Sequence, residues 1–377
     1  MKVDFYRHSL GQEDVASTIE AMKQTMLSRG DTVYEFQRKL AEYTENSYCV
    51  GLMSCTAALE FALILLGIEK GDEVITTPLT FVATANVILH RGATPVFVDV
   101  EAETGNIDAT RIEKAITPRT KAILPVHLYG LMCDMKAIRK IADHHHLTII
   151  EDAAHCVEGI RDGVKPGQLS DAACFSFYAT KNITSGEGGA LVLKDEELAN
   201  RASCLALHGM DKSADKRMQG KFTHWDMNEP GYKANMSNIQ AAMLLPQLKR
   251  IEIMLARREA LGRRYEEAFS KIQGISMQKI PANCRSARHL FTIWVNPKIR
   301  DRCIELLQDA GIGVTVNYRP VHLLHYFRKQ SSYASGMYPC AERIGNSTLS
   351  LPLYPSLKND EIEYVIQSVT KIIRQLS

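Results

Sequence analysis

The 377-residue chain has no C-x-x-C pair, and its cysteines are odd in number and scattered along the sequence. This pattern argues against a disulfide framework and against a structural zinc site. Most of the cysteines lie in apolar runs, where a free cysteine behaves as a small hydrophobic residue. They are Cys49, Cys55, Cys133, Cys156, Cys174, Cys204, Cys284, Cys303 and Cys340.

Three other features are missing. No stretch of about 18 apolar residues occurs, and residues 1–15 lack the apolar core of a signal peptide, so we expect a cytoplasmic protein without a membrane partner. The formal net charge is only +2, which gives no electrostatic case for a nucleic acid partner. No G-x-G-x-x-G follows the first predicted strand, which argues against a nucleotide-binding dehydrogenase.

What the chain does have is an alternation of helical and extended patterns. Apolar runs at 48–54, 72–77, 94–100, 121–127, 147–154, 172–178 and 189–194 predict strands, and helical spacing separates the early ones. This order predicts an α/β fold with a mostly parallel sheet between helices, which becomes mixed where the last strands follow one another directly. Two helices are predicted before the first strand, at 13–27 and 31–45, with Asp31 as the N-cap of the second.

The length predicts two domains, since domains average roughly 100–200 residues. We place a large domain at residues 1–245 and a smaller α+β domain at 246–377, which begins within a long helical stretch at 237–270. Pro246 should kink that stretch. Beyond it we predict strands at 289–295, 314–319 and 348–353 and helices at 299–311 and 359–376.

Polar residues gather where predicted strands end, which is where open α/β sheets bind ligands. Ser54, Cys55 and Thr56 open a helix whose free N–H groups favour a phosphate, although in isolation simple N-capping by Ser54 or Thr56 is the better explanation. Asp152 follows an apolar run, so its carboxylate needs either backbone N–H groups or a cationic partner such as a protonated ring nitrogen.

Lys181 lies 29 residues after Asp152, in a turn rich in glycine. A lysine whose pKa is lowered by burial or by a neighbouring cation can form an imine with a carbonyl, whereas most lysines are solvated. Lysine, aspartate and a phosphate site together are what pyridoxal phosphate requires. The glycines at 186, 188 and 189 allow a sharp turn and a close approach to a ligand.

Other candidates remain open from the residues alone. His155 could lie over a cofactor or orient Asp152, or could simply occupy a turn. Phe81 could stack on a pyridine ring, or could be a core aromatic. The run His144, His145 and His146 suggests a metal site, but adjacent helical positions do not face one another, so we expect a solvated helix end and no metal.

Long motifs in a fixed order resemble the DegT/StrS-type nucleotide-sugar aminotransferases, which depend on pyridoxal phosphate and have fold type I, the aspartate aminotransferase fold. The resemblance covers nearly the whole chain. It is carried by "SCTAALEFAL", "GDEVITTPLTFVATANVILHRGATPVFVDV", "ILPVHLYG", "IIEDAAHCVEG", "FSFYATKNITSGEGGALV", "HGM", "GYKANMSNIQAAMLLPQL", "YRPVHL" and "LSLPLYPSL".

The resemblance implies a role for each candidate. Lys181 is similar to the lysine that binds the cofactor as an imine, and Asp152 to the partner of the pyridinium nitrogen. It also implies that His155 and Phe81 lie against the cofactor ring. Further positions match phosphate contacts, namely Ser54, Cys55, Thr56, Ser176 and, from the neighbouring subunit of a homodimer with shared sites, Asn235.

The chain departs from the family pattern in three places. Cys55 stands where the family usually has glycine, so a side chain must fit beside the phosphate. Residues 231–235 read Gly-Tyr-Lys-Ala-Asn instead of Gly-Tyr-Asn-Tyr-Arg, and with "KNIT" this resembles the subgroup that aminates C4 of the sugar. Asn317 stands where such enzymes often have histidine.

The resemblance implies transfer of an amino group from L-glutamate to a nucleotide-linked 4-keto-6-deoxyhexose. The product would be a 4-amino sugar for surface polysaccharide, such as the O-antigen of lipopolysaccharide. Amination at C3 is the alternative within the family, and a non-catalytic pyridoxal phosphate-binding regulator is another, against which the set of Lys181, Asp152 and Ser176 argues. Substrate contacts are expected from Tyr318, Arg319 and His322.

Overall fold

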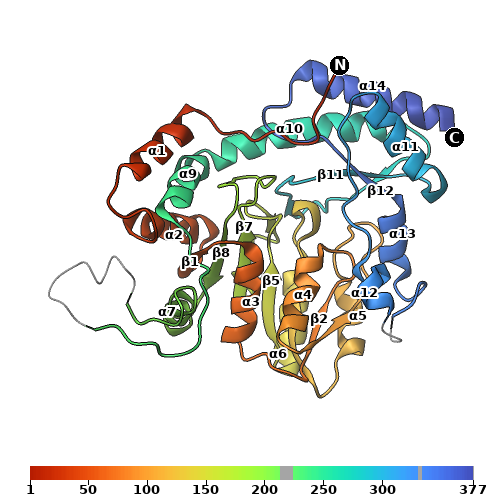
Figure 1. The fold of residues 1–377 in the computed structure, drawn as a ribbon. Coiled ribbons are helices and arrows are strands. Elements are labelled where there is room, and N and C mark those ends of the chain that lie inside the picture. The colour runs from red at the N-terminus through yellow and green to blue at the C-terminus, as the bar shows by residue number, and fades with distance from the viewer. Residues whose placement is uncertain (213–223, 330–332, 377) are drawn as a thin grey trace.

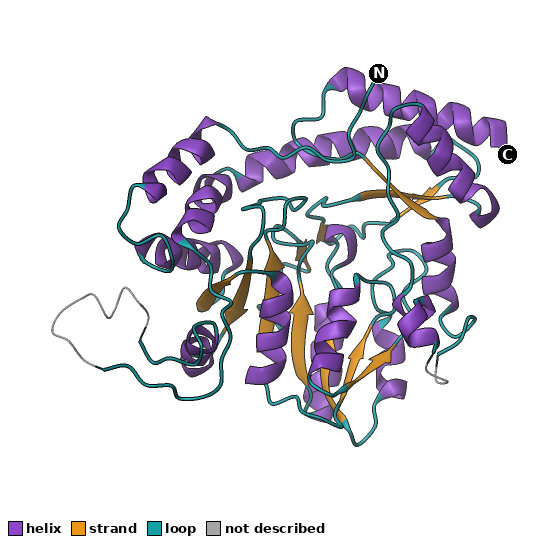
Figure 2. Cartoon of the chain, in the orientation of Figure 1, coloured by secondary structure: helices purple, strands orange, loops and turns teal. Residues whose placement is uncertain are grey.

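The computed structural model describes residues 1–212, 224–329 and 333–376. Its centre is a seven-stranded sheet between layers of helices (Figures 1 and 2). The strand order is β1 (Tyr48–Leu52), β8 (Gly189–Leu193), β7 (Ala172–Ser176), β5 (Thr148–Asp152), β4 (Thr120–Leu124), β2 (Glu73–Thr76) and β3 (Thr94–Phe97). Only β8 runs antiparallel to its neighbours, so the predicted mixed, mostly parallel sheet is confirmed.

Both faces of this sheet are covered, because successive side chains of each strand point to opposite sides. On one face, Ile150 and Cys174 pack with α3 (Cys55–Leu65), α4 (Val82–His90) and α7 (Glu196–Leu205). On the other face, Ile149 and Phe175 belong to cores formed with α2 (Asp31–Thr44), α5 (Ala109–Ile112), α6 (Met135–His145) and α9 (Asn238–Lys249). Burial on both faces explains why these strands read as continuous apolar runs.

The N-terminal helices pack outside the sheet, where α1 (Gln12–Met22) and α2 both contact α9. The N-cap of α2 is Gly30, and Asp31 is the first helical residue, so the prediction of an Asp31 N-cap is wrong by one position. The long helical stretch is interrupted at Arg250, between α9 and α10 (Ile251–Phe269), while Pro246 lies inside α9. The break therefore follows the proline by four residues.

A second core lies beyond α10. The strands β9 (Ser276–Met277), β11 (Phe291–Trp294) and β12 (Thr348–Leu351) form an antiparallel sheet. It packs with α11 (Pro297–Asp309) and α14 (Asn359–Leu376), while α12 (His325–Arg328) and α13 (Pro339–Ser347) lie beside the large sheet (Figure 1). Val3 pairs with Ile312 and joins this second core, so the first residues of the chain pack with its C-terminal part.

Short elements complete the described chain. They are the strands β6 (Ile160–Arg161) and β10 (Cys284–Arg285), which pair with each other, and the 3-10 turns η1 (Glu113–Ala115), η2 (Leu128–Gly130) and η3 (Val321–Leu323). The strand predicted at 314–319 is absent, since Thr315 makes only an isolated bridge to Ser350. None of the described helices has the length and apolar content needed to span a membrane.

Candidate functional site

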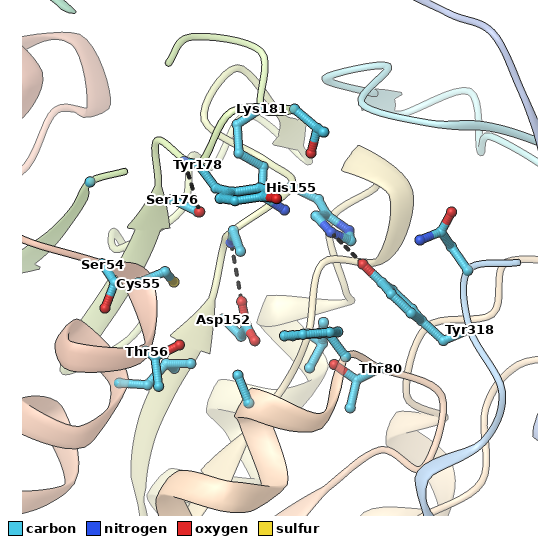
Figure 3. Close-up of a pocket in the computed structure, with 18 of the residues that line it drawn as sticks. Ser54, Cys55, Thr56, Thr80, Asp152, His155, Ser176, Tyr178, Lys181 and Tyr318 are labelled. Carbon is cyan, nitrogen blue, oxygen red and sulfur yellow. Dashed lines mark hydrogen bonds between the residues drawn. The ribbon is translucent and has the colours of Figure 1, made fainter. Parts of the chain in front are cut away.

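A pocket of about 500 Å³ opens at the carboxyl ends of β5 and β7 (Figure 3). That volume lies within the usual range for small-molecule sites, roughly 300–1,000 Å³. Most of the residues predicted from the sequence line it, namely Ser54, Cys55, Thr56, Phe81, Asp152, His155, Ser176, Lys181 and Tyr318. The pocket therefore joins the strand ends of the large sheet to a segment from the C-terminal part of the chain.

Three predicted residues do not line this pocket. Asn235 pairs with Leu52 of β1, and its side chain bonds Lys233 and Ser28. His322 is fully buried and bonds Glu342 (3.0 Å). Arg319 is exposed. A contact of His322 with a ligand in this pocket therefore has no geometric support.

Lys181 lies in the loop between β7 and β8, and its side chain is partly buried in the pocket. The Lys181 N–H donates to Tyr178 O (2.9 Å), which closes the turn. The loop is tied to α9 by the amide of Gln247, which bonds the N–H (3.0 Å) and the carbonyl (2.7 Å) of Thr184. Burial lowers the pKa of Lys181 to about 8, against the opposing effects of Cys55 and Asp152. The alternative of a solvated loop lysine is therefore wrong.

Asp152 ends β5 at the floor of the pocket and is 6% exposed. Its Oδ1 accepts from the N–H of Ala154 (3.1 Å), and its Oδ2 accepts from Thr84 Oγ1 (2.8 Å). Burial raises the pKa of Asp152, whereas Thr84, Ala154 and Lys181 oppose that rise. The carboxylate is thus partly satisfied by backbone, as one sequence interpretation held, and it still borders the pocket.

The start of α3 forms the part of the pocket wall where the sequence predicts phosphate contacts. Ser54 caps the helix, since its side chain accepts from Ala57 N (3.1 Å), so the N-cap interpretation is confirmed for this residue. Thr56 and the buried Cys55 follow it along the pocket wall. Gly189 of β8 lies so close that a Cβ there would be 2.2 Å from Ser54 C and 2.4 Å from Cys55 N. That approach requires glycine.

His155 lies on the opposite wall, between Lys181 and Tyr318 (Figure 3). Its Nδ1 accepts from Tyr129 N (3.3 Å), which leaves the ring proton on Nε2 to donate to Tyr318 Oη (3.1 Å). Burial, Lys181 and His289 hold the pKa of His155 well below its usual value. The histidine is therefore a neutral donor, fixed in one tautomer.

Phe81 stands at the mouth of the pocket and is 57% exposed, so the alternative of a core aromatic is wrong. Its ring centroid lies 6.0 Å from that of Tyr318. An exposed aromatic face beside a lysine and a carboxylate can stack on a planar ligand.

Several residues of the site carried no clear sequence signal. Thr80 and Tyr178 line the pocket, and Thr84 bonds Asp152 beneath it. His289 contacts His155, with ring centroids 4.4 Å apart and the ring planes tilted by 32°, and it donates from Nδ1 to Asn182 Oδ1 (3.2 Å). No local sequence signal identifies Thr84, because its role depends on a contact with Asp152, 68 residues away in sequence.

Behind Lys181 lies a buried polar network. The Asn182 amide donates to Glu158 Oε2 (2.9 Å) and to Ala287 O (2.9 Å). Glu158 in turn pairs with Arg258, and both are almost fully buried. The hydrogen bonds from Asn182 to Glu158 and to Ala287 tie the residue next to Lys181 to this buried ion pair.

The histidine run at the end of α6 lies at the surface, as expected, but two of its rings approach each other. The rings of His144 and His145 are 4.7 Å apart, and His145 Nε2 lies 3.0 Å from Glu113 Oε1 of η1. Their ligand atoms could approach a common ion, since all lie within 4.8 Å of one another. The geometric reason given for dismissing the run is therefore wrong for these two residues, although the cluster lies on the surface.

Known proteins match this chain over nearly its full length. Residues 8–370 match the DegT/DnrJ/EryC1/StrS aminotransferase family. The spore coat polysaccharide biosynthesis protein SpsC of Bacillus subtilis is 43% identical over 371 residues, which cover 97% of this chain and 95% of that protein.

Solved structures agree with this match. The PMP-form of the putative sugar aminotransferase Spr1654 from Streptococcus pneumoniae superposes with a TM-score of 0.95 at 31% identity, with both chains fully covered. Helicobacter pylori PseC, an aminotransferase involved in the biosynthesis of pseudoaminic acid, superposes with a TM-score of 0.93 at 28% identity, also over both full chains. The chain belongs to the DegT/DnrJ/EryC1/StrS aminotransferase family and is a pyridoxal phosphate-dependent sugar aminotransferase.

Proposed function

We propose that this enzyme moves an amino group from L-glutamate to a nucleotide-linked 4-keto-6-deoxyhexose. The product would be a 4-amino sugar for a surface polysaccharide or another glycan. The observation that carries the proposal is Lys181, whose pKa is lowered to about 8, in one pocket with the buried carboxylate of Asp152.

The pocket suits pyridoxal phosphate in its donor groups. We assign the phosphate to the start of α3, with Ser54, Cys55 and Thr56, and to Ser176 on β7. The ring nitrogen is assigned to Asp152. The chemistry that this cofactor supplies is an electron sink and a carrier for the amino group between donor and acceptor.

Lys181 is assigned two tasks. Its amine would hold the cofactor through the cofactor's carbonyl carbon and, when free, would accept a proton from the substrate carbon and return it. Both tasks need the neutral amine. A pKa near 8 makes roughly a tenth of it available at pH 7, against fewer than about one in a thousand for an ordinary lysine.

Asp152 and His155 are assigned to the ring. An ionised Asp152 favours a protonated ring nitrogen, and such a ring withdraws electrons most strongly. His155 is held by Tyr129 and Tyr318, so it presents a fixed face toward the pocket. Phe81, exposed at the mouth, is assigned to stacking on the bound ring.

Two observations support a nucleotide-linked sugar as the acceptor, namely the residues at the mouth of the pocket and the names of related proteins. Tyr318 and Asn317 line the mouth, and Arg319 is exposed beside them without a hydrogen bond or ion pair in the described part of the chain. An exposed guanidinium suits a diphosphate. The names of SpsC and PseC refer to the biosynthesis of spore coat polysaccharide and of pseudoaminic acid, which supports a sugar substrate.

We further propose a homodimer with shared sites, working in the cytoplasm. Asn235 does not line the pocket of its own chain, so a contact with the phosphate would have to be made in the site of a partner subunit. All nine cysteines are free, which suits a reducing compartment.

A two-step assay tests the proposed substrate. The enzyme is first converted with L-glutamate, and then UDP-, GDP- and dTDP-linked 4-keto-6-deoxyhexoses and 3-keto sugars are supplied separately. The expected product is a 4-amino sugar from one of the 4-keto substrates, identified by NMR. A product aminated at C3, with no turnover of any 4-keto sugar, would overturn the assignment.

A further inference from the structure

The carboxylate of Asp152 is held by a side chain from another element. Thr84 lies on the first turn of α4, is fully buried, and places its hydroxyl 2.8 Å from Asp152 Oδ2. The second carboxylate oxygen accepts from Ala154 N (3.1 Å). Each oxygen thus has one partner within the protein, and each keeps a further lone pair.

The direction of these hydrogen bonds follows from the charge of the acceptor. An ionised carboxylate can only accept, so the single proton of Thr84 points to Asp152. Thr84 Oγ1 then accepts from Thr80 Oγ1, which lies 2.9 Å away. Thr80 itself lines the pocket, so a chain of two hydroxyls runs from the pocket wall to the carboxylate. Such a chain favours the ionised form of Asp152.

The hydroxyl of Thr84 behaves unlike those of Thr18, Thr44 and Thr370, which also lie in helices. A threonine in a helix commonly donates to the carbonyl four residues earlier. Thr18 bonds Asp14 O, Thr44 bonds Leu40 O, and Thr370 bonds Ile366 O in this way. Thr84 instead bonds a side chain on β5, 68 residues away in sequence.

We propose that Thr84 is a positioning residue, which keeps the Asp152 carboxylate ionised and oriented toward a protonated ring nitrogen. This inference rests on the proposed role of Asp152. Thr80 supports this role because its hydroxyl donates a hydrogen bond to Thr84 Oγ1. Thr84 itself is not among the residues that line the pocket, so its effect reaches the ligand through Asp152.

The test compares two ligands that differ only at the ring nitrogen. Dissociation constants are measured for pyridoxal phosphate and for its carbocyclic analogue, in which C–H replaces that nitrogen. Thr84→Val removes the hydroxyl and keeps the shape, and Thr84→Ser keeps the hydroxyl. We expect Thr84→Val to weaken the binding of pyridoxal phosphate on the order of 10-fold. Thr84→Ser should bind pyridoxal phosphate within about 2-fold of the wild type. Neither variant should change the affinity for the analogue by more than about 2-fold.

The outcomes distinguish a failure of the positioning role of Thr84 from a failure of the pairing between Asp152 and the ring nitrogen. Equal weakening of both ligands by Thr84→Val means that Thr84 only packs, and no weakening means that it has no role; either result overturns the proposal. If the wild type binds both ligands equally, the pairing of Asp152 with the ring nitrogen fails, and this inference fails with it. If Thr84→Val does not fold, the same two dissociation constants are measured for Thr80→Val. We then expect a smaller loss of affinity, confined to pyridoxal phosphate.

Discussion

Tyr318 Oη lies 3.1 Å from His155 Nε2, and this bond joins the C-terminal part of the chain to the strand end that carries Asp152. The two rings are nearly parallel, with 15° between their planes. Since Nδ1 of His155 accepts from Tyr129, the bond has one direction, from the imidazole to the phenol oxygen. The hydrogen bonds with Tyr129 and Tyr318 therefore orient the ring of His155 from two sides.

Tyr318→Phe should lower kcat/KM for the amino donor by about 3- to 10-fold, because the His155 donor loses its acceptor. Because burial, Lys181 and His289 keep the pKa of His155 well below its usual value, His155 stays neutral above pH 6 in both proteins. The pH profile should keep its shape while its height falls. A new titration step between pH 6 and 8 in the variant would contradict this account.

The lowered pKa of Lys181 predicts how cofactor capture depends on pH. Protonation blocks attack on a carbonyl, so the rate of capture by cofactor-free enzyme should reach half its maximum near pH 8 and level off above about pH 9, at about tenfold its value at pH 7. Stopped-flow absorbance measures this rate. Nα-acetyl-lysine, with an unperturbed amine, is the reference and should keep accelerating beyond pH 10. A continued rise of the enzyme rate to that pH would show that burial does not lower the Lys181 pKa.

Gly189→Ala should damage both the fold and the phosphate site. The added Cβ would lie 2.2 Å from Ser54 C and 2.4 Å from Cys55 N, and both are backbone atoms that cannot move aside without shifting α3. We expect a loss of about 3 kcal/mol, a melting temperature lower by roughly 5 °C, and weaker binding of pyridoxal phosphate. Gly11→Ala is the matched control, since its nearest contact would be 4.0 Å away. Equal melting temperatures for the two variants would refute the close approach.

A mixture of two inactive variants tests the shared site. Lys181→Ala and Asn235→Ala each damage every site of a pure dimer. A mixed dimer holds one site with both wild-type residues. Equal unfolding and refolding of the pair should therefore restore about a quarter of wild-type activity, because about half of the dimers are mixed. Activity no higher than the mean of the two pure variants would place Asn235 in the site of its own chain, or in none.

Apolar periodicity predicted the sheet well, because its strands are buried on both faces and each one reads as a short apolar run. It failed at 314–319, where "VTVNYR" has the composition of a strand but only Thr315 pairs, with Ser350. Composition does not reveal whether a neighbouring strand is available.

The sequence predicts those residues of the site that lie at or just after the ends of strands, such as Asp152 and Lys181. Thr84 and His289 were not predicted, because their roles depend on contacts with residues 68 and 107 positions away in sequence. No local pattern records such contacts. Tyr318 was expected as a substrate contact only from the family resemblance, and it reaches the pocket together with Asn317 through the packing of the C-terminal part against the large sheet.

The central claim is that Lys181 moves the proton in an amino transfer from L-glutamate, and the absorbance spectrum of cofactor-loaded enzyme mixed with L-glutamate tests it most directly. We predict conversion of the wild type to the pyridoxamine form with about one 2-oxoglutarate released per site, and conversion at least about 100-fold slower in Lys181→Ala loaded with the same cofactor. An unchanged wild-type spectrum, or conversion of Lys181→Ala at the wild-type rate, would contradict the account.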